Sequence, residues 1–225
     1  MDTRIGLLIA SANTTMEYEF QMLAPKGMSI HATRLEHRRL SFETLAAARA
    51  DALSGAKLLA HADVDCIVYG ITAAGFMLGE NHDHQLASEI TAATGIRTIT
   101  VLQAVLAKLE ALGVKRIALG TPYPADVTER EVRFFSETGY SVTGFAHLGH
   151  VDVAEIGRLD SATAVKVAHE AVNQRAQALF LSCTNWHTLP VIAQLKEALS
   201  IPVFSSNTAG FALATNALGS QETYK

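Results

Sequence analysis

The sequence predicts an α/β protein of two similar lobes, each a mostly parallel sheet flanked by helices. Short β-branched, apolar runs alternate with longer Ala- and Leu-rich segments of helical period, which is typical of parallel strands joined by covering helices. The order of strands, helices and small-residue loops also recurs in the two halves of the chain. We therefore expect the lobes to be related by pseudo-twofold symmetry, with a cleft between them.

The strand and helix patterns follow one another along the whole chain. The strand pattern occupies residues 4–10, 29–34, 65–69, 97–100, 116–120, 141–147, 178–182 and 202–204. The helical pattern occupies residues 42–62, 82–93, 102–112, 125–137, 162–174, 189–199 and 208–218. Gly95, Gly113 and Gly139 each follow a helical segment, where glycine most easily takes the left-handed conformation that ends a helix.

The internal repeat predicts where the lobes divide and where a ligand binds. We expect the first lobe to comprise residues 1–100 with 208–225, and the second to comprise residues 101–207. Small-residue loops follow the strands at 10–15 and 69–75 in the first half and at 120–123 and 181–185 in the second. Ligands of open parallel sheets bind beyond the carboxyl ends of the strands, so these four loops are expected to surround one cleft.

Composition excludes several classes of protein. The 225 residues are 49% apolar, which is enough to bury a core without disulfides or a structural metal. The 18 Lys and Arg against 22 Asp and Glu give a net charge of −4 with no basic block, which argues against nucleic acid as a partner. No apolar run reaches the roughly 18 residues of a membrane span, and the N-terminal apolar run is too short for a signal peptide. We expect a cytoplasmic protein with no membrane partner.

The two cysteines have different surroundings. Cys183 lies between a predicted strand and the predicted helix 189–199, so we expect the helix dipole to lower the pKa of its thiol below about 8.5. Such a thiol can exchange a proton with carbon or attack an electrophile; the alternative is a small buried residue at a tight turn. Cys66 lies inside a predicted strand, where cysteine acts as a small hydrophobic residue. A structural disulfide between them is not expected in a reducing compartment.

Polar residues gather at the predicted strand ends. Asn13 and Thr14 precede a helix start near Met16, where they can face an anion or simply cap the helix. The run 205–207 can likewise line the cavity or cap the helix that follows it. Hydroxyl, phenol and amide groups that can bind carboxylate oxygens come from Thr72, Tyr123, Thr184 and Asn185. Together these groups favour a small carboxylate as the ligand.

The sequence lacks the common metal and nucleotide motifs. Of nine histidines, His82 and His84 form the densest group, but their spacing does not bring both rings onto one ion. HExxH and paired CxxC motifs are absent, as are GxGxxG, GxxxxGK[ST] and GxSxG. We therefore expect no metal and no cofactor.

Several stretches carry a family resemblance. They are residues 11–17, the loop after Tyr69, the segment 111–123, and the runs 182–185 and 202–207. In order and spacing they resemble the maleate isomerase and arylmalonate decarboxylase branch of the aspartate/glutamate racemase superfamily. The resemblance covers nearly the whole chain. It implies a cofactor-free enzyme of two α/β lobes that binds a small acid between them and reacts at the carbon next to a carboxylate.

The resemblance also implies roles for individual residues. Members commonly use two cysteines, one per lobe; Cys183 matches the second-lobe position, and Ile71 stands at the first-lobe position. A two-base racemase or a maleate-type isomerase needs the first thiol. The decarboxylase subgroup keeps only the second-lobe cysteine, which protonates an enediolate after carbon dioxide leaves, although its first-lobe residue is small whereas Ile71 is bulky.

Other positions follow the same comparison. Thr72 and Tyr123 match oxyanion-binding positions of the decarboxylases, Ala73 replaces a hydroxyl residue expected there, and Asn13 matches a carboxylate contact of the isomerases. The residues expected to bind substrate are Asn13, Thr14, Ile71, Thr72, Ala73, Tyr123, Thr184 and Asn185.

The leading hypothesis is a cofactor-independent decarboxylase of a substituted malonate-type acid, with Cys183 as the single proton donor. The alternatives are a maleate-type cis–trans isomerase or an aspartate/glutamate-type racemase with an altered first-lobe group. A third alternative is a relative that binds carboxylates without catalysis. The expected partner is a small carboxylate substrate, and a homo-oligomer is compatible with the sequence.

Overall fold

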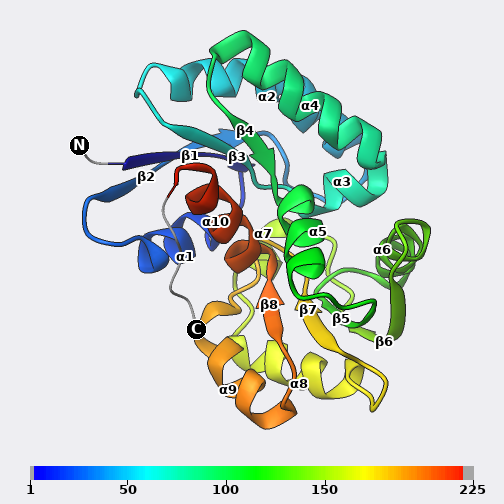
Figure 1. The fold of residues 1–225 in the computed structure, drawn as a ribbon. Helices are drawn as coiled ribbons and strands as arrows, with labels where there is room; N and C mark the ends of the chain where they lie inside the picture. The colour runs from blue at the N-terminus through cyan, green and yellow to red at the C-terminus, as the bar shows by residue number, and fades with distance from the viewer. Residues whose placement is uncertain (1–2, 220–225) are drawn as a thin grey trace.

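The computed structural model describes residues 3–219 and contains two parallel sheets of four strands each (Figure 1). The first sheet has the order β2-β1-β3-β4 and the second the order β6-β5-β7-β8. The strands of the first sheet are β1 (Thr3–Ala10), β2 (Met28–Leu35), β3 (Cys66–Tyr69) and β4 (Thr98–Thr100). Those of the second sheet are β5 (Arg116–Thr121), β6 (Ser141–His147), β7 (Ala178–Leu181) and β8 (Val203–Ser205). The two lobes therefore repeat one strand order, as the sequence predicts.

Helices cover both sheets. In chain order they are α1 (Met16–Leu23), α2 (Phe42–Ala60), α3 (Thr72–Leu78), α4 (Glu80–Thr94), α5 (Val101–Ala111), α6 (Ala125–Glu137), α7 (Val153–Ile156), α8 (Ser161–Ala171), α9 (Leu189–Leu199) and α10 (Ser206–Ala217). Figure 1 shows α2 and α4 over the first sheet and α8 and α9 over the second. Helices α5 and α10 pack against each other between the sheets. One continuous apolar core therefore extends through both lobes.

All eight predicted strands and all seven predicted helices are present, with ends within two or three residues of the expected ones. Gly95, Gly113 and Gly139 have φ values of +73°, +64° and +86°, as expected for residues that end helices. The structure adds α1, whose start the sequence indicates, and the short helices α3 and α7. The part of residues 219–225 after Gly219, which the first-lobe assignment includes, lies outside the described residues.

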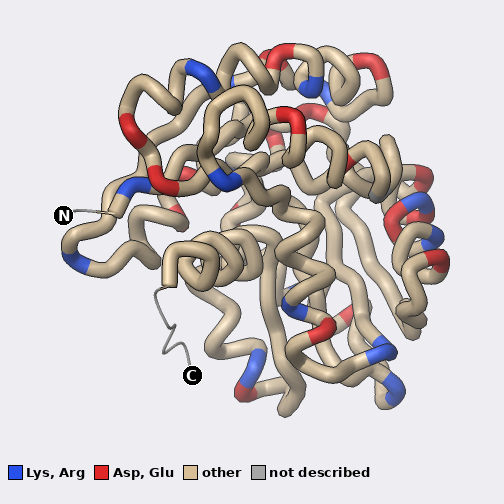
Figure 2. Tube along the Cα trace, turned by 45° about the horizontal axis from the view of Figure 1, so that its top comes forward, with Lys and Arg blue, Asp and Glu red and all other residues tan. Residues whose placement is uncertain are grey.

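The charged side chains lie mainly on the outer elements. Figure 2 shows both signs mixed along the outer helices, whereas the centre of the molecule between the sheets carries few charged positions. Within residues 3–219, no helix is long and apolar enough to cross a membrane.

Candidate active site

A small cavity lies where the carboxyl ends of the two sheets meet. Its volume is about 30 Å³, which is the space of roughly one water molecule in the liquid. Seven of the eight residues predicted to bind substrate line it, together with Cys183. Those seven are Asn13, Ile71, Thr72, Ala73, Tyr123, Thr184 and Asn185. The loops that sequence analysis placed around one cleft are therefore brought together in space.

Cys183 occupies an unusual backbone conformation at the end of β7. Its φ is +128°, a region that side-chain-bearing residues rarely adopt. The surrounding structure holds it there: its amide donates to Ser206 Oγ at 3.0 Å, and its Sγ accepts from the Asn185 amide at 3.3 Å. Three residues on, the Trp186 indole is fully buried and donates to Thr163 Oγ1 at 3.0 Å. The loop thus fixes the thiol in the wall of the cavity.

The expectation of a lowered thiol pKa is wrong. Burial raises the pKa of Cys183 to about 11, although the Tyr123 phenol and the backbone amides of Asn185 and Trp186 act to lower it. Burial is the largest effect, and α9, whose dipole was expected to lower the pKa, begins only at Leu189. Cys183 is therefore a neutral thiol at pH 7, the form that a proton donor needs.

The N-terminus of α9 is occupied by a carboxylate from the other lobe. The amides of Thr188 and Leu189 both donate to Glu19 Oε1 at 2.9 Å, and Asn207 Nδ2 donates to Glu19 Oε2 at 2.7 Å. Glu19 lies on α1 and is fully buried, which raises the pKa of its carboxyl, while these hydrogen bonds and His187 act to lower it. The positive end of the helix dipole therefore acts on Glu19 instead of Cys183.

Several predicted substrate ligands join the two lobes through hydrogen bonds. Asn13 Nδ2 donates to Thr184 Oγ1 at 3.0 Å, and Thr184 Oγ1 donates to the Gly70 carbonyl at 2.8 Å. Asn185 Oδ1 accepts from the Thr14 amide at 2.8 Å, and its Nδ2 donates to the Val153 carbonyl. The hydroxyl of Thr184 and the amide of Asn185 are thus already engaged.

Thr14 and the run 205–207 do not line the cavity. Thr14 is exposed and is absent from the cavity wall. Ser205 Oγ accepts from the Thr208 amide at 3.3 Å, so the helix-capping alternative holds for the run 205–207. None of these three residues lines the cavity; Ser206 instead supports it from behind by accepting from the Thr72 hydroxyl at 3.1 Å.

The structure adds four residues to the predicted lining of the cavity; three of them lie in the stretches 35–40 and 148–153, on whose side chains we expect the choice of substrate to depend. His37, Leu40, Val153 and Ile156 line the same space. His37 is buried, its Nδ1 has no hydrogen-bond partner among the described residues, and burial lowers its pKa. His37 and Leu40 come from the loop between β2 and α2, and Val153 and Ile156 from the short helix α7, and neither segment is long enough for a periodic pattern in the sequence.

Two segments beside the cavity pair with each other. The Leu40 amide donates to the Val151 carbonyl at 2.8 Å, and the Val153 amide donates to the Arg38 carbonyl at 2.8 Å. Between these bonds, Arg39 and Asp152 form an isolated antiparallel bridge. We call this pairing of residues 38–40 with 151–153 the clasp. Because Leu40 and Val153 of the clasp line a cavity of only about 30 Å³, we expect the clasp to open when a diacid binds.

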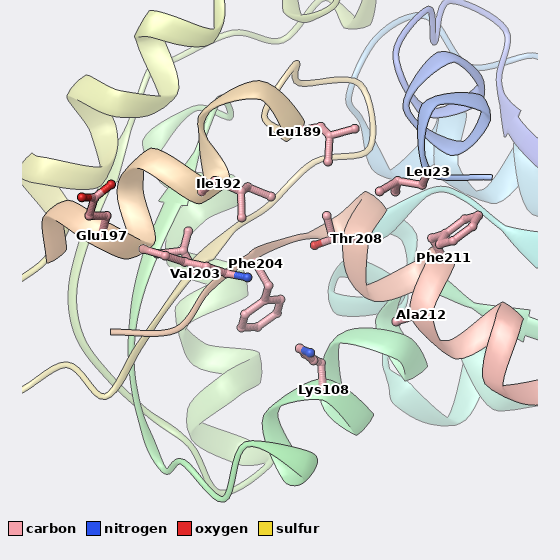
Figure 3. Close-up of a pocket in the computed structure, with 12 residues that line it drawn as sticks. Leu23, Lys108, Leu189, Ile192, Glu197, Val203, Phe204, Thr208, Phe211 and Ala212 are labelled. Atoms are coloured by element: carbon pink, nitrogen blue, oxygen red, sulfur yellow. The ribbon is translucent and has the colours of Figure 1, made fainter. Parts of the chain in front are cut away.

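A larger cavity of about 570 Å³ lies apart from this site, between α9, β8, α10 and α5. Figure 3 shows the side chains of Ile192, Phe204 and Phe211 around it. It shares no lining residue with the small cavity and contains no cysteine or histidine. The thiol chemistry therefore belongs to the small cavity. Within residues 3–219, no three His, Cys, Asp or Glu side chains gather as a metal-binding group.

Sequence comparison agrees with this geometry. The arylmalonate decarboxylase family profile matches residues 5–224. The chain belongs to the arylmalonate decarboxylase family. Arylmalonate decarboxylase of Bordetella bronchiseptica is 37% identical over 142 residues, which are 62% of this chain and 59% of that protein. Maleate isomerase of Nocardia farcinica is 29% identical over 92% of this chain and 86% of its own.

Solved structures from both branches share the fold. A mutant arylmalonate decarboxylase in its liganded form superposes with a TM-score of 0.90 at 29% identity, covering 98% of this chain and 94% of that one. The maleate cis–trans isomerase of Nocardia farcinica bound to TRIS gives 0.92 at 26% identity, covering 96% and 92%. Members of both branches are enzymes. Their names give two reactions, decarboxylation and cis–trans isomerisation, and the comparisons do not choose between them.

Proposed function

We propose that the protein is a cofactor-independent decarboxylase of substituted malonate-type acids, with Cys183 as the proton donor. The observation that carries the proposal is the presence of a single thiol in the cavity, with Ile71 at the first-lobe position. Cys66 is fully buried in β3 and does not line the cavity. A decarboxylation needs one proton donor, whereas a two-base reaction needs a second group on the opposite face.

The cavity wall divides into a polar and an apolar part, which suits a diacid that loses one carboxylate. Tyr123 and the second amide hydrogen of Asn13 offer donors to the carboxylate that stays. The apolar part is formed by Leu40, Ile71, Val153 and Ile156. A carboxylate held against these side chains loses its hydration, which favours its departure as carbon dioxide.

The proposed reaction proceeds in two steps. First, the bond between the central carbon and one carboxylate breaks and carbon dioxide leaves. The electron pair of the broken bond is delocalised onto the remaining carboxylate, which gives an enediolate. Donors near Tyr123 stabilise this negative charge, and such preorganised donors are each worth about 2.7–4 kcal/mol of barrier. The Cys183 thiol then protonates the carbon from one face, leaving a thiolate that regains its proton before the next turnover.

The test is a panel of substituted malonates, maleate, aspartate and glutamate in D₂O. We expect carbon dioxide release from a malonate, with one deuterium at the new carbon–hydrogen bond and a single product configuration. Conversion of maleate to fumarate, or exchange at an amino-acid carbon, with no malonate turnover would overturn the proposal. Acids that raise the melting temperature without turnover would indicate a binding protein instead.

One observation favours a second candidate, an isomerase or racemase. His37 lines the cavity, and its Nδ1 has no hydrogen-bond partner among residues 3–219, so this imidazole can serve as the second acid or base. A related Nocardia farcinica isomerase mutant has been solved with a covalently bound succinylcysteine intermediate. Replacing His37 by Gln abolishes turnover if the residue is the second acid or base, and leaves most decarboxylase activity if Cys183 acts alone.

Ile71→Cys adds the first-lobe thiol, and a gain of racemase activity in this variant would show that the rest of a two-base site is present.

A further inference from the structure

The larger cavity, between α5, α9, β8 and α10, has the size and the mostly apolar wall of a small-molecule site. Its volume of about 570 Å³ lies within the roughly 300–1,000 Å³ that is usual for such sites. The large apolar side chains of the wall are those of Leu23, Leu189, Ile192, Val203, Phe204 and Phe211. Leu23 and Leu189 are only half-buried. An apolar group that enters the cavity therefore gains free energy by leaving water.

The cavity lies at an edge of the second sheet. Strand β8 is last in the order β6-β5-β7-β8, and among the described strands only β7 pairs with it. Figure 3 shows Ile192 of α9, Phe204 of β8 and Phe211 of α10 around one shared space, with Lys108 of α5 on its remaining side. Side chains from four elements thus surround a space that a single ligand can fill.

The charged residues of the wall leave an excess of one positive charge. They are Lys108, which is half-buried on α5, and Lys196 and Glu197, which are exposed on α9. Neither lysine forms an ion pair with another residue of the range 3–219. Figure 3 shows Glu197 at the outer end of the cavity, with its carboxylate directed away from Phe204. A ligand that complements this wall therefore combines an apolar body with one negative charge.

The other polar groups at the cavity narrow the kind of anion. No arginine lines it, and at the N-terminus of α9 the amides of Thr188 and Leu189 already donate to Glu19. The Thr208 hydroxyl donates to the Ser205 carbonyl at 3.1 Å and accepts from the Ser205 amide at 2.9 Å. The wall thus lacks the arginine and the free helix N-terminus that favour a phosphate group. The two lysine ammonium groups remain as donors, and they suit a single carboxylate.

We propose that the cavity between α5, α9, β8 and α10 is a second binding site, which takes a monocarboxylate with an apolar body. The body lies against Ile192, Phe204 and Phe211, and the carboxylate is attracted by Lys108 and Lys196. The site shares no lining residue with the small cavity that contains the thiol. The inference therefore goes beyond the proposed decarboxylation and does not depend on it.

The test is isothermal titration calorimetry of the full chain with octanoate, beside 1-octanol and acetate, which carry the apolar body and the head group separately. We expect one octanoate per chain, bound at least about tenfold more tightly than acetate because its body is buried. The double variant Lys108→Gln with Lys196→Gln weakens octanoate binding about threefold or more and leaves 1-octanol binding unchanged. The matched control is Lys57→Gln with Lys166→Gln, which removes two exposed lysines of α2 and α8. Equal effects of the two double variants, or equal affinities for octanoate and acetate, overturn the inference.

A second comparison locates the ligand. Ala193→Trp adds a large side chain at the cavity wall, whereas Ala198→Trp adds the same side chain at an exposed position of α9 outside it. We expect the affinity for octanoate to fall about tenfold or more in the first variant and to stay within about twofold in the second, because only the first fills the cavity. Ala212→Phe, in the wall on α10, replaces the first variant if Ala193→Trp does not fold.

Three results of this comparison overturn the inference. Unchanged octanoate binding in both Ala193→Trp and Ala212→Phe shows that the acid binds elsewhere, including in the small cavity. Binding that appears only after removal of residues 220–225 assigns the cavity to the chain's own last residues. A dimer that dissociates in Ala193→Trp and not in Ala198→Trp assigns it to a second copy of the chain. None of these results changes the role proposed for Cys183, which turnover by Cys183→Ala tests separately.

Discussion

At the residue scale, the chemistry of Cys183 depends on features that its neighbours in sequence do not reveal. The pattern at the end of β7 predicts the position of the thiol in the cleft, and the structure places it there. The acidity of the thiol depends on burial and on Glu131 and Tyr123, which come from other parts of the chain. The spacing of residues in the sequence does not reveal how deeply a side chain is buried. For this reason the expectation that the helix dipole lowers the pKa of Cys183 was wrong.

Glu131 gives a stability prediction with a definite sign. Its pKa is raised from 4.5 to about 8 in the folded protein, so the folded state holds one more proton than the unfolded state between these values. The stability associated with this group is complete below pH 4.5 and is lost as pH rises through about 8, by at most about 1.4 kcal/mol per pH unit. Urea unfolding from pH 5 to 9 should show this loss in the wild type and not in Glu131→Gln. The same pH dependence in both proteins would contradict it.

At the scale of elements, the alternating pattern was sufficient to predict the eight strands and the long helices. Helix α3 was not predicted, because Ile71 before it makes no side-chain cap and Gly75 interrupts its pattern. Helix α7 has only four residues, too few for a periodic signal. The hydrogen bonds of Thr184 and Asn185 could not be predicted either, since their partners lie more than 30 residues away or in the other lobe.

The cap that α1 supplies to α9 gives a second prediction. Glu19→Ala removes the acceptor for the Thr188 and Leu189 amides and for Asn207 Nδ2. We expect the free energy of unfolding to fall by about 3 kcal/mol, because these donors stay buried without a partner. The control is Glu17→Ala on the same helix, whose ion pair with Arg34 is partly exposed and contributes about 1 kcal/mol or less. Chemical denaturation measures both; similar losses in the two variants would be inconsistent with the capping role.

At the scale of the whole molecule, the clasp joins the two lobes beside the small cavity of about 30 Å³. Its two segments lie between the predicted strands and helices, so their pairing is not visible in one sequence. The lobes are otherwise held together by buried contacts such as Asn13 with Thr184. Opening of the clasp is thus the simplest way for a substrate to enter.

A disulfide across the clasp tests this motion. Arg39 and Asp152 form a non-hydrogen-bonded antiparallel pair, because the backbone hydrogen bonds join their neighbours in the chain. The Cα atoms of such a pair lie about 4.5 Å apart, which is within the range of a disulfide. In the double variant Arg39→Cys with Asp152→Cys, we expect oxidation to lower kcat at least about tenfold and dithiothreitol to restore it. The reduced double variant is the control, because it carries the same substitutions. Equal rates in the two redox states, with the disulfide verified by thiol titration, would show that substrate enters elsewhere.

The proton donated by Cys183 is the step on which the proposed reaction depends, and the most direct measurement is turnover by Cys183→Ala beside Cys66→Ala. Both variants lose one buried sulfur, but only Cys183 lines the cavity. With the malonate that the wild type decarboxylates, we expect kcat of Cys183→Ala to fall about 10³-fold with an unchanged fold by circular dichroism, and Cys66→Ala to stay within about threefold of wild type. Wild-type turnover by folded Cys183→Ala would contradict the proposed function.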